Sequence, residues 1–238
     1  MKGPSRLVLV RHAESARNVA KKGNIFFADD ESRRAVRGIP DHAIPLTPEG
    51  KAQSERTGVA LRARFGPFDH VYHSGYRRTL ETTEGLLRAY PEEERASIQV
   101  HQDVFIRERD PGFAYDMTTA EAEAAFPWLQ EYWRTSGSFF ARPPGGESVA
   151  QVCERVHLFL QTVSRDNPGE RVLVVTHGVA MRAFRFLLES WTYEDAAAHF
   201  RGDPPHNCSV TVYEPAQEGG SLELREYNTV YREGGRGE

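Results

Sequence analysis

The chain has 238 residues, of which 39% are hydrophobic and 27% charged, which is enough apolar material for one α/β core. Its 30 Lys and Arg against 34 Asp and Glu give a formal net charge of −4, so the surface as a whole carries no electrostatic signature of binding to nucleic acid or to an anionic membrane. The apolar runs are short and flanked by charges, which argues against a transmembrane span or a secretory signal peptide. We expect a cytoplasmic protein.

Apolar periodicity predicts alternating strands and helices along the chain. Strands or extended segments are expected at 7–10, 70–74, 100–106, 171–178, 210–213 and 222–227. Helices are expected at 13–21, from 48, at 76–89, from 119 with an interruption near 127, from 149 to the Asn-Pro-Gly stop at 167–169, and up to 189. A Gly-rich tail at 233–238 is expected to fray.

Helix starts and excursions complete this pattern. Thr47 before Pro48, and Thr118 three residues before Glu121, have the spacing of helix caps. Residues 23–45 have no clean period, and long segments of this kind are often lids or binding loops. We expect residues 23–45 and 110–146 to be excursions that cover a site.

The two cysteines, Cys153 and Cys208, lie far apart and outside any C-x-x-C motif. This spacing argues against a disulfide framework and against a zinc site. Both are expected to be small buried hydrophobic side chains.

The predicted architecture is a single α/β domain over 1–238, with a mainly parallel central sheet covered by helices on both faces in three layers. His12, Ser74 and His177 each follow the carboxyl end of a predicted strand. Ligands of open α/β sheets bind at that edge. If the strands before His12 and His177 are neighbours, a strand spacing of about 5 Å brings the two rings together.

Five motifs follow one another along the chain: R-H-x-E-x-x-x-N from Arg11, L-T-x-x-G from Leu46, S-x-x-x-R-T-x-x-T from Ser74, G-G-E-S from Gly145 and T-H-G from Thr176. This ordered set resembles the histidine phosphatase superfamily, also called the phosphoglycerate mutase-like family, over essentially the whole chain. The resemblance implies that a phosphoryl group is transferred through a phosphohistidine, with no metal and no cofactor.

In that mechanism His12 is the nucleophile. It attacks as a neutral imidazole, and its other ring nitrogen should donate to a fixed acceptor. Arg11, Arg78 and His177 should supply positive charge to the phosphoryl oxygens, His177 as a charged donor and arginine as a bidentate fork. Glu108 should act as general acid and then activate water.

The substrate-binding set is expected to include Asn18 as a neutral donor, Ser15 and Gly178. A second anionic group on the substrate has candidate partners in Arg33, Arg34, Arg37 and Arg142, although solvated surface is the slightly favoured alternative for any one of them. The partner implied is a small phosphorylated molecule.

Several assignments leave alternatives open. Asp110 competes with Glu108, Arg77 with Arg78, and Ser15 could simply cap a helix. Glu147 in G-G-E-S either orients a catalytic His or Arg, or merely opens a helix. The remaining histidines without a partner pattern are read as structural: His73, His101 and His206.

Two departures from the mutase pattern decide between family members. After Asn24 the chain lacks G-W-x-D, and Pro111 stands where the mutase-like E-R-x-Y-G pattern has an aromatic residue. These departures favour a metal-independent phosphomonoesterase. The alternatives are a phosphoglycerate mutase or related phosphotransferase, and a non-catalytic protein that keeps the phosphate pocket to bind a ligand.

Overall fold

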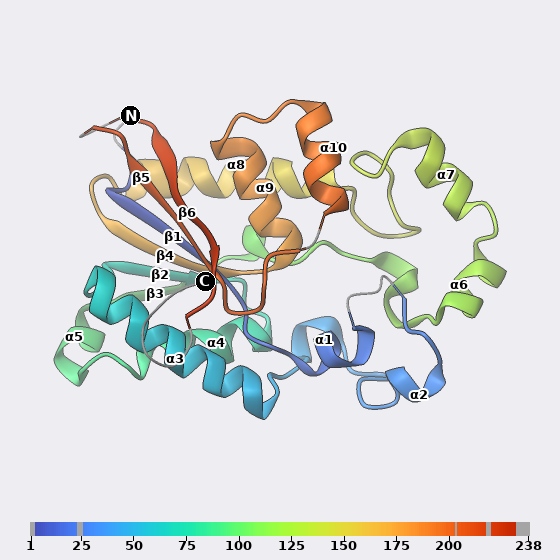
Figure 1. The fold of residues 1–238 in the computed structure, drawn as a ribbon, viewed down its shortest axis with the longest axis horizontal. Helices are drawn as coiled ribbons and strands as arrows, with labels where there is room; N and C mark the ends of the chain where they lie inside the picture. Colours follow the sequence, from blue (N-terminus) through green and yellow to red (C-terminus); the bar gives the residue numbers. More distant parts are fainter. Residues whose placement is uncertain (1–2, 23–25, 203, 218–219, 232–238) are drawn as a thin grey trace.

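Among the residues that the structure describes, six strands form one mixed sheet in the order β3-β2-β4-β1-β5-β6 (Figure 1). The computed structural model of the chain describes residues 3–22, 26–202, 204–217 and 220–231. The strands are β1 Arg6–Arg11, β2 His70–His73, β3 Gln99–Gln102, β4 Arg171–Thr176, β5 Val210–Pro215 and β6 Leu222–Thr229.

Helices pack on both faces of this sheet. Figure 1 shows α8 and α9 on one face and α3 and α4 on the other. The α-helices are α1 Ala16–Lys21, α2 Asp30–Arg33, α3 Pro48–Phe65, α4 Arg77–Leu87, α5 Glu92–Ser97, α6 Thr119–Ala125, α7 Leu129–Ser136, α8 Val149–Asp166, α9 Gly178–Leu188 and α10 Tyr193–Arg201. Three 3₁₀ turns, η1 Asp41–Ala43, η2 Val104–Ile106 and η3 Gly112–Asp116, lie between them.

The side chains of β1 show why helices cover both faces of the sheet. Successive side chains of a strand point to opposite faces. Leu7 and Leu9 pack in the cluster that includes the apolar stripe of α8 and α9, whereas Val8 and Val10 pack with residues of α3 and α4. All four side chains are fully buried, which is why β1 reads as a continuous apolar run and not as an alternating one.

The predicted α/β architecture is confirmed, with one refinement. The strands β3, β2, β4 and β1 are parallel neighbours. The late strand β5 instead runs antiparallel to β1, and β6 runs antiparallel to β5. The sheet is therefore mainly parallel, with an antiparallel extension beyond β1.

Local capping signals correctly located several helix ends. Thr47 caps α3 through Gly50 N, with Pro48 at the first helical position. Thr118 and Glu121 form the capping box of α6. The short helices α5 and α10 were not predicted, although Thr192 caps α10 with Asp195 in the same way.

Residues 26–45 are more ordered than their lack of period suggested. Asp29 forms a capping box with Ser32 and starts α2, and η1 follows. A small cluster of Phe27, Val36 and Ile44 holds the segment together. Residues 23–25, which include the Asn24 of the mutase-like pattern, lie outside the described residues. The tail at 233–238, which is expected to fray, lies outside them as well.

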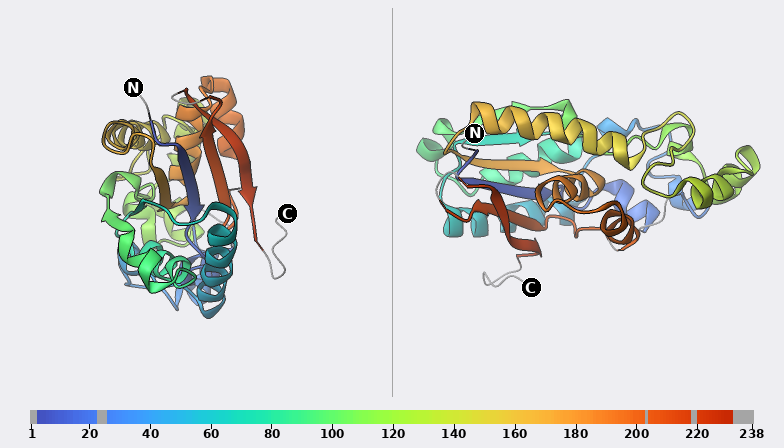
Figure 2. Two further views of the ribbon diagram at one scale, coloured as in Figure 1. Left: turned by 90° about the vertical axis from the view of Figure 1, so that its left-hand side faces the viewer. Right: turned by 90° about the horizontal axis from the view of Figure 1, so that it is seen from above.

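The segment 112–136, which contains η3, α6 and α7, projects beyond the carboxyl ends of the strands (Figure 2). Phe27 and Thr118 form an isolated β-bridge between the two excursions. Arg33 of α2 adds a bidentate bond to Glu121, at 2.6 and 2.8 Å. The two excursions are thus joined to each other at the sheet edge where the histidines emerge.

Cys153 and Cys208 are buried and unpaired, as expected from their spacing. Burial raises the pKa of both thiols to about 12, so neither is a reactive thiolate. None of the helices among the described residues is long and apolar enough to cross a membrane.

Candidate active site

The two histidines that end β1 and β4 lie side by side. These strands are parallel neighbours, and their last residues, Arg11 and Thr176, are partners in the register. His12 and His177 follow directly, and their ring centroids are 5.1 Å apart in an edge-on arrangement. The sheet topology alone therefore brings the two rings together, although 164 residues separate them in the chain.

The ring of His12 is held in one tautomer. Its Nδ1 lies 2.8 Å from the carbonyl oxygen of Ala13. Because a carbonyl oxygen can only accept, Nδ1 carries the hydrogen and Nε2 keeps a lone pair. Burial, then Arg78 and Arg11, lower the pKa of His12 well below its ordinary value. The ring is therefore neutral at pH 7, as a nucleophilic imidazole requires.

This lowered pKa predicts the titration of His12. A neutral form that is favoured in the folded protein persists as the pH falls through 6.5 and is lost only well below it. We expect the NMR signals of the His12 ring, assigned by their loss in His12→Ala, to stay constant between pH 8 and pH 6. A titration midpoint near 6.5 would contradict the burial argument.

His177 differs from the sequence prediction. Its Nδ1 accepts a hydrogen bond from Arg78 Nε at 3.3 Å, and its Nε2 lies 2.8 Å from Ser74 Oγ. Burial, then Arg78 and His12, lower its pKa well below the ordinary value. In this structure His177 is therefore neutral, with Nε2–H donating to Ser74 and both ring nitrogens engaged. Its role as a charged donor to a bound phosphate stays a prediction.

Arg78 also differs from the expected bidentate fork for phosphate. Its Nη1 donates to the carbonyl oxygen of Asp41 at 2.6 Å and to Oδ1 at 3.1 Å, and its Nη2 donates to Oδ2 at 3.3 Å. With Nε on His177, four of its five N–H groups are occupied. A phosphate that binds Arg78 must share it with Asp41, a residue that the sequence motifs did not indicate. The alternative, Arg77, pairs with Glu81 on the exposed side of α4.

Arg11 is the second guanidinium at this point. Its Nη1 donates to the carbonyl oxygen of Pro205, whereas Nε is buried and has no hydrogen-bond partner among the described residues. Gly178 packs beside it, since a Cβ at that position would lie 3.6 Å from Arg11 Nε. An unpaired buried N–H is costly, so this donor suits an anion next to His12.

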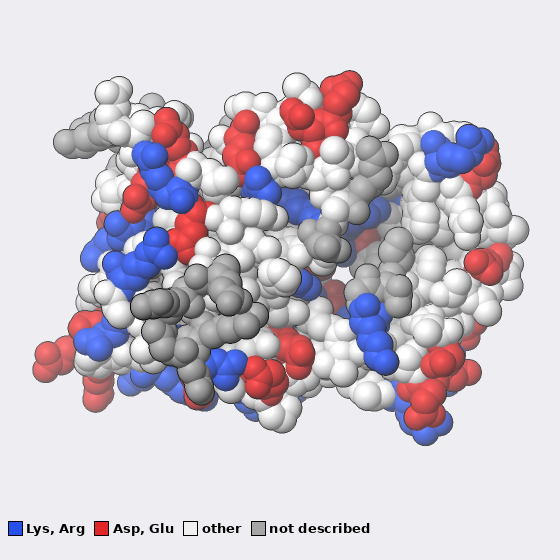
Figure 3. Space-filling model, in the orientation of Figure 1, with Lys and Arg blue, Asp and Glu red and all other residues white. Residues whose placement is uncertain are grey.

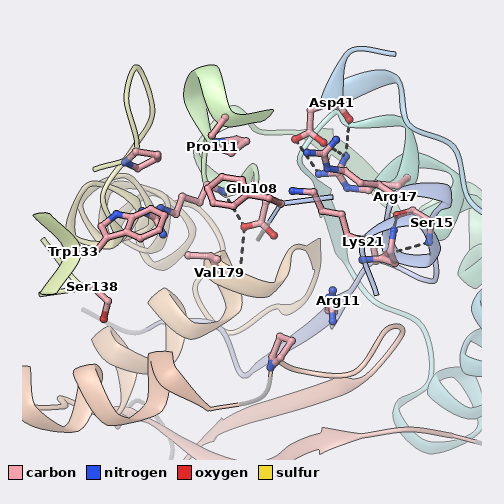
Figure 4. Close-up of a pocket in the computed structure, with 18 residues that line it drawn as sticks. Arg11, Ser15, Arg17, Lys21, Asp41, Glu108, Pro111, Trp133, Ser138 and Val179 are labelled. Atoms are coloured by element: carbon pink, nitrogen blue, oxygen red, sulfur yellow. Dashed lines mark hydrogen bonds and ion pairs between the residues drawn. The ribbon is translucent and has the colours of Figure 1, made fainter. Parts of the chain in front are cut away.

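Glu108 is the carboxylate that the structure brings to the site. Its Oε1 accepts from Arg109 N at 2.8 Å and from Val179 N, in the first turn of α9, at 3.2 Å (Figure 4). The competing Asp110 is exposed and caps its own turn through Gly112 N. Of the two, only Glu108 lines the pocket with His12.

Glu147 has a role that neither sequence alternative described in full. It forms a two-pronged ion pair with buried Arg155 of α8, with both bonds 3.0 Å long, and also accepts from Arg107 and from Asp110 N. Arg155 in turn donates to the carbonyl oxygens of Phe105, Arg107 and Glu108. The pair therefore holds the loop that presents Glu108, while Ser148 performs the helix capping.

Ser15 and Asn18 form the capping box of α1, so the capping alternative for Ser15 is correct. The Oδ1 of Asn18 accepts from Ser15 and from Asn207. Since the amide oxygen is occupied, its NH₂ group is the end left as a donor. Both residues line the pocket, which is compatible with the predicted binding role.

One pocket of about 470 Å³ contains most of these groups. Lys and Arg side chains lie beside the hollow between the body of the molecule and the α6–α7 segment, together with some Asp and Glu atoms (Figure 3). The lining includes six residues that carried no motif signal: Arg17, Lys21, Phe26, Asp41, Arg109 and Trp133. Two of them could have been predicted from the sequence. Arg17 and Lys21 are four residues apart in the predicted helix that contains Asn18, and this spacing places both on one face of the helix.

The arginines proposed for a second anion do not line this pocket. Arg33 is buried against Glu121 and Asp30, a pairing that lowers the pKa of Glu121 to about 2. Arg37 is exposed, 3.8 Å from Asp30. Arg142 is exposed as well and donates to the carbonyl oxygen of Gly146. Local ion pairs and exposure explain why these charges are not available to the site.

His73, His101 and His206 lie outside the pocket lining. His101 bonds to His70, and His73 accepts from Gly75 N. Among the described residues no group of three or more His, Cys, Asp or Glu is placed to hold a metal ion.

A comparison with protein families matches residues 7–228 to the model of the histidine phosphatase superfamily, branch 1. The chain belongs to this superfamily. Phosphoglycerate mutase-like protein AT74 of Arabidopsis thaliana is 32% identical over 95% of this chain and 69% of its own length. A 2,3-bisphosphoglycerate-dependent phosphoglycerate mutase of Parvibaculum lavamentivorans is 30% identical over 82% and 85%.

Among solved structures, the α-ribazole phosphatase of Shigella flexneri superposes with a TM-score of 0.72 over 94% of this chain and 96% of that enzyme. Its sequence identity is 20%, so this likeness shows a shared fold. This member of the histidine phosphatase superfamily is thus similar to a curated mutase in sequence and to a phosphatase in fold.

Proposed function

We propose that the protein is a metal-independent phosphomonoesterase that hydrolyses a small phosphorylated metabolite through a phosphohistidine on His12. The observation that carries the proposal is the state of His12: a neutral ring, its Nδ1 held by Ala13, in a pocket shared with Arg11, Arg78 and Glu108. This combination supplies a nucleophile, cations for the phosphoryl oxygens and a proton donor.

The first half of the reaction forms the phosphoenzyme. The Nε2 lone pair of His12 attacks phosphorus, and the bond between phosphorus and the ester oxygen breaks. Glu108 gives its proton to the departing alkoxide, which leaves as the alcohol. The positive charge that develops on the ring is stabilised because Nδ1–H donates to the carbonyl oxygen of Ala13.

The second half returns the enzyme to its starting state. Glu108, now a carboxylate, takes a proton from water, and the water oxygen attacks the phosphoryl group. The bond between phosphorus and Nε2 breaks, which releases inorganic phosphate and neutral His12. The cationic donors of Arg11 and Arg78 stabilise the charge on the phosphoryl oxygens in both steps, the role that metal ions take in other phosphoryl-transfer enzymes.

A screen of phosphate release tests this function. Sugar phosphates, nucleotides, phosphoglycerates and phosphoamino acids are offered to wild type and to His12→Ala in parallel, with excess EDTA throughout. Release by wild type alone supports the proposal. Activity that is lost in EDTA and restored by Mg²⁺ would overturn the metal-independent mechanism, and equal release by both chains would overturn the phosphohistidine.

A phosphoglycerate mutase is the second candidate, because a curated mutase is 30% identical over most of this chain. Against it stand Pro111 and the missing G-W-x-D motif. Supplying 3-phosphoglycerate with a bisphosphoglycerate primer separates the two. Formation of 2-phosphoglycerate faster than phosphate release would identify a mutase.

A further inference from the structure

The helix α1 places two cations on the wall of the pocket that contains His12. Arg17 and Lys21 are one helical turn apart and both line it (Figure 4). The cap of this helix, Ser15, lies three residues after His12, so α1 is positioned directly by the strand that delivers the nucleophile. Neither residue has a part in the phosphoryl-transfer steps described above.

Arg17 is held in place by aromatic stacking. Its guanidinium lies 3.8 Å from the ring centroid of Tyr115 and 5.2 Å from that of Phe27. Its Nη2 donates to the carbonyl oxygen of Tyr115, and its Nη1 is buried without a hydrogen-bond partner among the described residues. A planar guanidinium that is immobilised with an unused N–H group suits the recognition of an anion.

Lys21 is close enough to Arg17 to feel its charge. Burial first, and then Arg17, lower the pKa of Lys21 to about 7, although Asp41 and Asp116 act in the opposite direction. Its ammonium also lies 5.1 Å from the Phe27 ring centroid. Two cations that repel each other in a partly buried wall are stabilised when an anion binds between them.

The charge of the whole lining favours a substrate with more than one anionic group. The described lining residues include five cations, Arg11, Arg17, Lys21, Arg78 and Arg109, against two carboxylates, Asp41 and Glu108. The lining histidine, His12, is neutral, and so is His177 beside it. With Lys21 protonated, the lining residues carry three more positive than negative charges, which exceeds the two charges of a phosphomonoester dianion.

The other residues that line the pocket offer few hydrogen-bond donors to a second anionic group. Phe26 and Trp133 stack on each other, and Pro111 and Pro143 extend the apolar surface. Arg109 is occupied, since its Nε donates to the carbonyl oxygen of Glu147 at 2.7 Å and its Nη2 to that of Ala141 at 3.3 Å. Apart from Arg109, and from Arg11 and Arg78 beside His12, the cations of the described lining are Arg17 and Lys21 of α1.

We infer that Arg17 and Lys21 form a subsite for a second anionic group, a carboxylate or a phosphoryl group, carried by the alcohol part of the phosphomonoester. This inference rests on the proposed function, since the reacting phosphate is placed at His12. In this inference Arg17 and Lys21 bind the second anionic group, in place of the Arg33, Arg37 and Arg142 expected from the sequence.

Matched substrates test the subsite. Glycerol 3-phosphate and 3-phosphoglycerate differ by a carboxylate, and fructose 6-phosphate and fructose 1,6-bisphosphate differ by a phosphoryl group. We expect wild type to favour the doubly anionic member of at least one pair by about tenfold or more in kcat/KM, the size expected for a charge-assisted hydrogen bond. The preferred pair tells which anion the subsite takes.

Substitutions on α1 locate the preference. In Lys21→Gln and in Arg17→Met the ratio of kcat/KM within the preferred pair should fall by about tenfold, toward a value of one. Lys21→Arg should retain it. The matched control is Lys22→Gln, which removes an exposed lysine that does not line the pocket and should leave the ratio at its wild-type value.

The pH gives a readout that a structural defect would not reproduce. Lys21 loses its charge as the pH rises through about 7, in the field of Arg17 on its own helix and of Asp41 and Asp116 on the segments packed against it. The wild-type ratio for the carboxylate pair should therefore decrease between pH 6 and pH 8.5, whereas that of Lys21→Arg should not, because arginine keeps its charge.

The outcomes distinguish a failure of the proposed subsite from a failure of the proposed phosphomonoesterase function. Turnover by wild type without preference in either pair, or a preference that survives Lys21→Gln and Arg17→Met, overturns the subsite and leaves the phosphatase standing. Failure of wild type to release phosphate from any ester, or equal release by His12→Ala, overturns the proposed function itself.

Discussion

Replacing His12 by alanine is expected to lower phosphomonoester turnover by at least about 1,000-fold, because no other group near the reacting phosphate can form the covalent intermediate. His177, the nearest imidazole, has both ring nitrogens engaged with Arg78 and Ser74. The fold should survive, since the backbone N–H of residue 12 still donates to the carbonyl oxygen of Thr176. Circular dichroism and thermal unfolding check that point.

The intermediate itself can be measured. Wild type mixed with a ³²P-labelled ester and denatured in alkali should retain label, and His12→Ala should not. His101→Gln is the matched control, because it removes a histidine on the edge strand β3 that does not line the pocket. Residual turnover above a few per cent of wild type, or label on the His12→Ala chain, would contradict the assignment.

Glu108→Gln is expected to produce the second largest effect, and one that depends on the leaving group. An alkoxide needs a proton as it departs, so hydrolysis of alkyl esters should slow by roughly 10²–10⁴-fold. An aryl oxide leaves without help, and hydrolysis of aryl esters should slow by about tenfold or less. Glutamine keeps an oxygen that can accept from Arg109 N and Val179 N, so the loop geometry should be preserved.

A series of phosphate esters with leaving groups of increasing pKa makes this test quantitative. The rate should fall more steeply with leaving-group pKa in Glu108→Gln than in wild type. Asp110→Asn, which alters an exposed carboxylate two residues away, should keep the wild-type slope. Parallel losses for alkyl and aryl esters would contradict the role of Glu108 as general acid.

Much of this site could be predicted from the sequence, because the information lies in short segments. A continuous apolar run predicts a buried strand, and a parallel sheet brings the ends of such strands to one edge. That is sufficient to place His12 beside His177. Arg78 and Glu108, which the family resemblance indicated, line the same pocket as His12. Capping residues such as Thr47 and Thr118 likewise act on neighbours three residues away.

The failures share a physical cause, which is a partner distant in the chain. The sequence predicted that Arg33 could bind substrate, but in the folded chain Arg33 pairs with Glu121, which is 88 residues away in the sequence. The sequence motifs indicated Arg78 but not its partner Asp41, which lies 37 residues away in the chain. Such ion pairs depend on how loops pack and leave no mark on local periodicity.

The protonation states of the two histidines also depend on residues that are distant in the chain. The residue types of the R-H-x-E and T-H-G motifs are enough to propose two histidines at one edge. Whether each ring is charged depends on burial and on the cations around it, and these arise only when β1, β4 and α4 have come together. Short-range pattern therefore determines which groups reach the edge of the sheet, while long-range packing determines the charge and the hydrogen-bond partner that each of them has there.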